Sequence, residues 1–102
     1  MPDFLYLIHP FREGFFEAPT AAETAVMDEH YAYLQRGVDD GRVLLAGPCL
    51  DDTFGLVILR AASEAAARDF MYADPSVVQN VMAAELHPLR LALTSRLLVE
   101  KP

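Results

Sequence analysis

The sequence predicts an α+β fold, a four-stranded antiparallel sheet with two helices on one face. Four apolar runs are bounded by Gly, Pro or charged residues, which is typical of strands. Two other segments, 20–40 and 63–73, repeat apolar residues at helical spacing, and each begins with a residue suited to cap a helix. The resulting order is strand, helix, strand, strand, helix, strand, which is the ferredoxin-like βαββαβ arrangement.

Composition limits the functions that this chain can have. Its 102 residues are enough for one domain with its own core, which we expect to span residues 1–102. A net charge of −7 argues against nucleic acid and anionic membranes as partners, because both need clustered Lys and Arg. The hydrophobic fraction of 53% is above average and indicates apolar surface buried between subunits.

Cysteine usage and the N-terminus point to a cytoplasmic protein. Cys49 has no partner for a disulfide within the chain. It could be a nucleophile, but no base is nearby in the sequence, so a small loop residue is the simpler interpretation. The apolar run 4–8 is too short for a signal peptide or a membrane span, and no basic segment precedes it.

The first strand, Phe4 to His9, ends at Pro10, and its apolar run predicts that both faces are buried. Residues 11–19 mix Gly, Pro and charges with three phenylalanines, and so predict a loop. These aromatic residues could form a lid over a pocket, a patch for a partner subunit, or a cluster packed on their own domain: Phe11, Phe15 and Phe16.

The first helix begins with a capping box, in which Thr20 is followed three residues later by Glu23. Gly41 is placed to end this helix. His30 lies at the edge of the predicted buried stripe. The stripe itself consists of apolar residues three or four apart: Met27, Tyr31, Leu34 and Val38.

The second and third strands, 43–46 and 54–59, flank a polar loop. Neither run alternates strictly between apolar and polar residues, so we expect cover on both faces of the sheet. The two helices can cover one face only. A homodimer that pairs the open faces of two sheets would cover the other.

The second helix is predicted to begin after its N-cap Ser63 and to end before Pro75. Asp74 is then placed to cap a short helical turn over 75–80. A final strand is expected over 81–93, either interrupted at Pro88 or placed at the sheet edge because of it, and residues 97–99 are expected to form a further strand or an arm that reaches the partner. The buried stripe of the second helix is predicted as Ala66, Phe70 and Ala73, with Ala67 and Met71 beside it.

Several short motifs occur in order along nearly the whole chain. They are His30 with Tyr33-Leu34, Asp40-Gly41-Arg42, Leu45-Ala46-Gly47-Pro48, Gly55, Ser63-Glu64-Ala65-Ala66, Asp74-Pro75 and Leu86-His87-Pro88-Leu89. In this order and spacing the chain resembles the YciI-like (YCII-related) family of dimeric α+β barrel proteins. The resemblance implies a homodimer and a candidate active site that pairs His30 with Asp74. Segments 11–19 and 76–80 depart from the family pattern, which could alter the pocket.

A histidine and an aspartate in contact suit acid–base chemistry. Imidazole takes and returns a proton near neutral pH, and a carboxylate on one ring nitrogen fixes the tautomer and leaves the other nitrogen free. We therefore expect isomerase-, lyase- or hydrolase-like proton transfer on a small organic molecule. The residues expected to bind that substrate are His9, Gly47, Pro48 and Ser76.

The residues alone leave other interpretations open. His30 could be a satisfied core histidine and Asp74 only a helix cap, because spacing does not bring them together. No metal is expected, since His9, His30 and His87 have no ligand spacing, and no cofactor is expected, since the glycines have no phosphate-loop pattern. The alternative functions are a non-catalytic small-ligand-binding or sensing dimer and a purely structural dimer.

Overall fold

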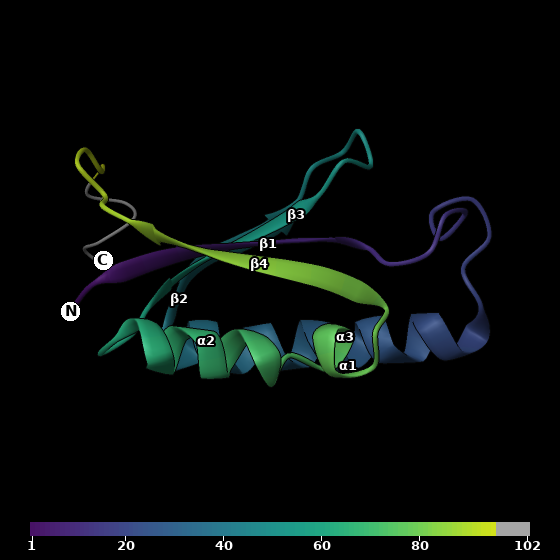
Figure 1. Cartoon of the computed structure of the whole chain (residues 1–102), viewed down its shortest axis with the longest axis horizontal. Coiled ribbons are helices and arrows are strands. Elements are labelled where there is room, and N and C mark those ends of the chain that lie inside the picture. Colours follow the sequence, from purple (N-terminus) through teal and green to yellow (C-terminus); the bar gives the residue numbers. More distant parts are fainter. Residues whose placement is uncertain (96–102) are drawn as a thin grey trace.

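A computed structural model describes residues 1–95, so the predicted element at 97–99 lies outside the described residues. The elements are β1 (Asp3–Pro10), α1 (Ala21–Asp39), β2 (Val43–Pro48), β3 (Gly55–Arg60), α2 (Glu64–Tyr72), α3 (Pro75–Val78) and β4 (Met82–Leu89). The strands form one antiparallel sheet in the order β2-β3-β1-β4. All helices lie on one face of this sheet (Figure 1). The predicted ferredoxin-like α+β fold is confirmed.

The central strand β1 buries one face only within this subunit. Phe4, Tyr6 and Ile8 alternate along the strand and are buried against the helices. The intervening Leu5 and Leu7 lie on the open face and are half-buried. The prediction that both faces of this strand are buried is therefore not met within one subunit, because none of the described elements covers the open face.

The N-terminus of α1 follows the predicted capping box. The Thr20 hydroxyl accepts a hydrogen bond from the backbone N–H of Glu23, and the Glu23 carboxylate accepts one from the backbone N–H of Thr20. At the other end, Gly41 takes the positive φ of 83° that favours glycine after a helix. Both predicted ends of the helix are confirmed.

The buried face of α1 is rotated from the predicted stripe. Tyr31 is 70% exposed, whereas His30 and Gly37 are the buried residues of this helix. A Cβ built on Gly37 would lie 2.6 Å from Cγ2 of Val43, so the missing side chain allows close packing of the helix on β2. That close approach turns Tyr31 outward, and the prediction of a buried Tyr31 was wrong.

The helix α2 starts at the predicted N-cap, where the Ser63 hydroxyl accepts from the N–H of Ala66. Its buried residues are Ala67, Phe70 and Met71, so the prediction for Phe70 is confirmed. Ala66 and Ala73 are exposed, and their places are taken by Ala67 and Met71, which were predicted to lie beside the stripe. The Met71 side chain has far more apolar area than the alanines, and the helix turns to bury it.

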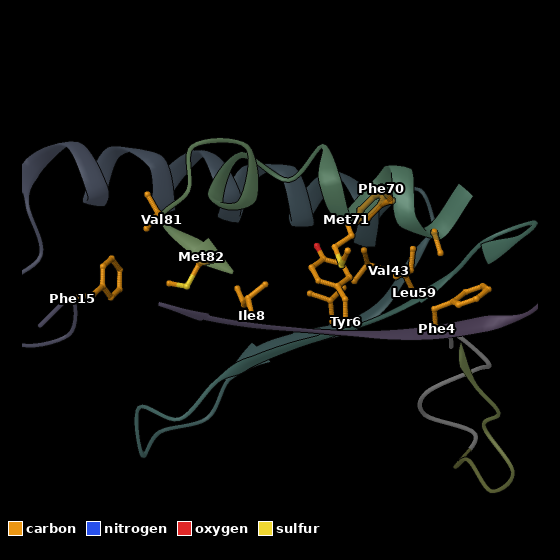
Figure 2. Close-up of a cluster of buried hydrophobic side chains, with 12 residues drawn as sticks. Phe4, Tyr6, Ile8, Phe15, Val43, Leu59, Phe70, Met71, Val81 and Met82 are labelled. Carbon is orange, nitrogen blue, oxygen red and sulfur yellow. The ribbon is translucent and has the colours of Figure 1, made fainter. Parts of the chain in front are cut away.

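The last strand is shorter than the predicted range of 81–93. It ends at Leu89 and runs through Pro88 without interruption at the sheet edge, so the edge position is the one of the two alternatives for Pro88 that the structure supports. Proline has no backbone N–H, and an edge position leaves one side of the strand without a partner. The core fills the space between sheet and helices (Figure 2), and no helix within residues 1–95 is long and apolar enough to cross a membrane.

Candidate active site

His30 and Asp74 are 44 residues apart in sequence and in direct contact in the fold. His30 lies in the middle of α1, on the face turned toward the α2–α3 junction, and Asp74 is the residue at that junction. Nδ1 of His30 lies 2.7 Å from Oδ1 and 2.9 Å from Oδ2 of Asp74. The structure therefore brings together the two residues that the family resemblance implies as a pair.

Asp74 is fixed in place by its role as N-cap of α3. Its Oδ1 accepts hydrogen bonds from the backbone N–H of Ser76 at 2.9 Å and from the Ser76 hydroxyl at 2.8 Å. Its Oδ2 accepts a third hydrogen bond from the Tyr6 hydroxyl at 2.9 Å. Asp74, Ser76 and Tyr6 are all fully buried, so this carboxylate is held by a complete set of donors away from water.

These contacts decide the ionisation of both buried acids. Burial alone would raise the pKa of Asp74, but the hydrogen bond and charge of His30 and the donors of Ser76 outweigh it, and the pKa lies below its ordinary value. Burial raises the pKa of Tyr6, and the negative charge of Asp74 raises it further. Asp74 is therefore ionised near neutral pH, while the phenol of Tyr6 keeps its proton and donates a hydrogen bond to the carboxylate.

An ionised Asp74 fixes the tautomer of His30. A carboxylate can only accept hydrogen bonds, so Nδ1 of His30 must carry a proton and Nε2 of the neutral ring has the free lone pair. No hydrogen-bond partner of Nε2 occurs among residues 1–95. No enclosed side-chain nitrogen or oxygen in this range lacks a partner, so Nε2 is accessible rather than sealed in the core.

His30 lines a cavity of about 430 Å³ that lies between α1 and the sheet. A register shift between Val43 and Leu45 marks a β-bulge in β2, which increases the local twist. The β2–β3 hairpin turns away from the helices (Figure 1), and residues of α1 and of this hairpin line the cavity. A volume of this size suits a small organic molecule.

The loop 11–19 closes one end of the cavity with aromatic side chains. Phe15 is 9% exposed and belongs to the core, and Phe16 packs edge-on against it with ring centroids 5.2 Å apart. Both line the cavity, whereas Phe11 is exposed and does not. Of the uses considered for these phenylalanines, Phe15 packs on its own domain, and Phe15 and Phe16 together form a cavity wall.

An ion pair connects this loop to α1. The Arg12 guanidinium donates to both carboxylate oxygens of Glu23, at 2.7 and 3.0 Å, and to the backbone carbonyl of Ala18 at 3.1 Å. Hydrogen bonds from Arg12, and then from the backbone N–H of Thr20, lower the pKa of Glu23 to about 2. The same carboxylate thus caps the helix and holds the loop beside the cavity.

The other residues expected in the site have different positions. Gly47 and Pro48 line the cavity, and so does the half-buried Cys49. Ser76 does not line it, since its side chain bonds Asp74 behind the histidine. His9 is exposed on the strand face opposite the buried Ile8, away from the cavity.

Sequence reasoning missed Tyr6, which reaches Asp74 from the central strand. Its signal was a phenol at a position that alternates with Phe4 and Ile8, because a buried hydroxyl needs a partner. His87, one of the three histidines without metal-ligand spacing, is exposed, and its Nε2 lies 2.8 Å from a carboxylate oxygen of Glu85. Within the described part of the chain, no three His, Cys, Asp or Glu side chains are grouped as a metal would require.

Comparison with known proteins shows which family and which solved structure this chain resembles. No curated protein sequence matches it significantly. A solved structure is similar with a TM-score of 0.64 and 18% sequence identity, over 85% of this chain and 93% of the other. That structure is 5-chloro-2-hydroxyhydroquinone dehydrochlorinase (TftG) from Burkholderia phenoliruptrix AC1100, in complex with 2,5-dihydroxybenzoquinone. The family model of the YCII-related domain matches residues 4–86, so the chain belongs to the YCII-related domain family, as its sequence motifs predicted.

Proposed function

We propose that this protein is a small acid–base enzyme in which His30 moves a proton to and from a small organic molecule bound in the cavity. The observation that supports this is the position of His30 between two environments. Its Nδ1 bonds a buried carboxylate, and its Nε2 is accessible where the ring lines the cavity. Nε2 would take a proton from the bound molecule, and Asp74 would stabilise the imidazolium that forms.

The donors around Asp74 suit this role. Tyr6 and Ser76 fix the orientation of the carboxylate, and His30 and Ser76 keep it ionised, so the ring of His30 is held in one tautomer before a substrate arrives. Gly47 and Pro48 would contact the substrate from β2. We take residues 1–102 as a single domain in this proposal.

The related dehydrochlorinase suggests a first reaction to test. By its name that enzyme acts on 5-chloro-2-hydroxyhydroquinone. In such an elimination the ring first tautomerises, so that the carbon bearing chlorine gains a proton as one hydroxyl loses its own and becomes a carbonyl. The base then takes the proton of a second hydroxyl, the freed electron pair forms a second carbonyl, and the ring electrons shift so that chloride leaves with the electrons of its bond to carbon. Elimination from a chlorinated ring is therefore the reaction to try first on this chain, followed by proton exchange on unchlorinated rings.

The test measures chloride release from 5-chloro-2-hydroxyhydroquinone, and proton exchange by NMR for a panel of small phenols, lactones and quinones in D₂O. The wild type should react with at least one compound. His30→Gln and Asp74→Asn should each slow that reaction by roughly 100- to 10,000-fold, the usual contribution of acid–base catalysis. The control His87→Gln changes an exposed histidine and should keep the wild-type rate.

An unchanged rate in His30→Gln would refute acid–base catalysis by this residue. The second candidate is a non-catalytic binding or sensing protein, which the apolar lining of the cavity favours. Under that function compounds would bind without any exchange or chloride release, and His30→Gln would change affinity only.

We also propose a homodimer through the open face of the sheet. Two cross-strand pairs of leucine and isoleucine lie side by side there, Leu5 with Ile58 and Leu7 with Leu56. All four are half-buried in the single subunit. A second copy placed on this face would remove the remaining apolar area from water.

A further inference from the structure

The lining of the cavity carries almost no charge. Among the described residues that line it there is no lysine, arginine, aspartate or glutamate, and His30 is the only histidine. The polar atoms come from few other places, namely Tyr31, Gln35 and Cys49. A permanently charged ligand would thus lose water here and gain no permanent opposite charge, which is costly.

The charges near the cavity would make an anion still less favourable. The nearest group behind His30 is the ionised carboxylate of Asp74, and the whole chain has a net charge of −7. Arg12 is the only basic residue of the loop 11–19, and its guanidinium is engaged by Glu23 and the carbonyl of Ala18. The site therefore lacks the free basic group that carboxylate and phosphate sites use.

Aromatic side chains supply the walls instead. Phe15 and Phe16 stand at 79° to each other at one end, and Phe54 contributes from the β2–β3 loop, directly before β3. Two rings in an edge-to-face arrangement offer both a face and an edge to a third ring, and such contacts add to the gain from burial alone. The bonds from Arg12 to Glu23 hold the loop, so these rings are in place before a ligand binds.

We propose that the cavity selects uncharged aromatic molecules, recognised by the Phe15–Phe16 pair, and rejects carboxylates and phosphates. This inference rests on the proposed function in taking the cavity as the substrate site. The inference goes beyond the proposed function by naming the class of substrate and by naming Phe16 as a residue that determines specificity. Phe16 is 43% exposed, so its role is in the cavity wall rather than in the core.

The test compares three probes of similar size by equilibrium binding at about pH 8. They are 2-naphthol, its saturated analogue decahydro-2-naphthol, and the anion 2-naphthoate. The naphthol should bind roughly 2- to 10-fold more tightly than the saturated alcohol. It should bind at least roughly 100-fold more tightly than the naphthoate, because a lone charge is costly to desolvate.

Two variants then test whether Phe16 is the residue that causes the preference for an aromatic ring. Phe16→Leu should remove most of the preference for naphthol over the saturated alcohol, while both remain bound. Phe11→Leu changes a phenylalanine of the same loop that does not line the cavity, and should leave all affinities unchanged. Circular dichroism confirms that each variant is folded.

Binding is measured in His30→Gln as well, which separates this inference from the proposed function. Ring preference that persists in His30→Gln supports the inference even if His30 proves not to be catalytic. Three results would overturn it: equal affinity for naphthoate and naphthol, an unchanged ring preference in Phe16→Leu, or no binding of any probe.

Discussion

The hydroxyl of Tyr6 donates a 2.9 Å hydrogen bond to Oδ2 of Asp74, and this bond joins the central strand to the junction of α2 and α3. Both residues are fully buried. The carboxylate that faces His30 is thus positioned by the sheet as well as by its own helix. Tyr6 acts through Asp74 and has no contact with the cavity, which makes it a positioning residue in the proposed mechanism.

We predict that Tyr6→Phe destabilises the fold by about 1.5–3 kcal/mol, the usual contribution of a hydrogen bond to a charged group. In the proposed reaction kcat should fall about tenfold with KM little changed, because the substrate does not touch Tyr6. Chemical unfolding and steady-state kinetics measure the two effects. Tyr33→Phe is the matched control, since its hydroxyl bonds the carbonyl of Phe70 instead; equal losses of kcat in both variants would contradict the assignment.

Asp74→Asn should change how stability depends on pH. The pKa of Asp74 is lowered by folding, so its contribution is present above the pKa of the unfolded carboxyl and is lost as pH falls through the folded value. The wild type should therefore lose stability from about pH 5 downward, and the variant should have a shallower slope. At neutral pH the variant should be less stable by roughly 1.5–3 kcal/mol.

Urea unfolding at a series of pH values measures this difference. Asp28→Asn is the control, because Asp28 is exposed on α1, and its curve should run parallel to that of the wild type. If the curve of Asp74→Asn also ran parallel to that of the wild type, the contacts of Asp74 in the folded protein would not lower the pKa of its carboxyl, and the prediction would be refuted.

Gly37→Ala should destabilise the protein although alanine favours helices. The added Cβ would lie 2.6 Å from Cγ2 of Val43 and 3.2 Å from Cζ of Phe70. Val43 is buried and β-branched, so it cannot turn aside easily. The overpacking costs about 1–3 kcal/mol and exceeds the gain of about 1 kcal/mol in helix propensity.

Thermal unfolding measures the effect of Gly37→Ala. The control is Gly47→Ala, where an added Cβ meets no atom within 4 Å. The variant at position 37 should melt several degrees below the control. A variant at 37 as stable as the wild type would mean that α1 and β2 can separate without loss.

The proposed dimer predicts that a charged side chain placed on the open face of the sheet separates the two subunits. The wild type should sediment as a dimer at micromolar concentration, and Ile58→Glu should sediment as a monomer, because a glutamate there would be buried without a partner. Leu50→Glu, in the β2–β3 loop and 96% exposed, should remain dimeric. A monomeric wild type would refute the pairing.

Local patterns in the sequence were sufficient to predict most of the fold. The capping box at Thr20, the caps Ser63 and Asp74, and the positive φ at Gly41 depend on neighbours within a few residues, and all were predicted. The exposure of Tyr31 was not, because it depends on how closely α1 approaches β2 at Gly37. The distance between α1 and β2 is set by how the two elements pack, and the spacing of apolar residues in the sequence does not reveal it.

The candidate site was predictable only in part, for a similar reason. His30, Asp74 and Tyr6 come from three elements, and no local spacing relates them. The family motifs supplied the first two, and Tyr6 was missed because a tyrosine in a strand is usually read as an apolar residue. The cavity is lined by residues of the loop 11–19, α1 and the β2–β3 hairpin, and the local sequence pattern does not encode how these segments are placed relative to one another.

Asp74 both caps α3 and faces His30, and this double use bears on how such a protein can evolve. Asn and Ser cap helices about as well as Asp but carry no charge. A single base change in an Asp codon gives Asn, so a descendant can keep its fold and its cavity while it gives up proton transfer. On the proposed mechanism, an enzyme and a ligand carrier are separated on this scaffold by one inherited substitution.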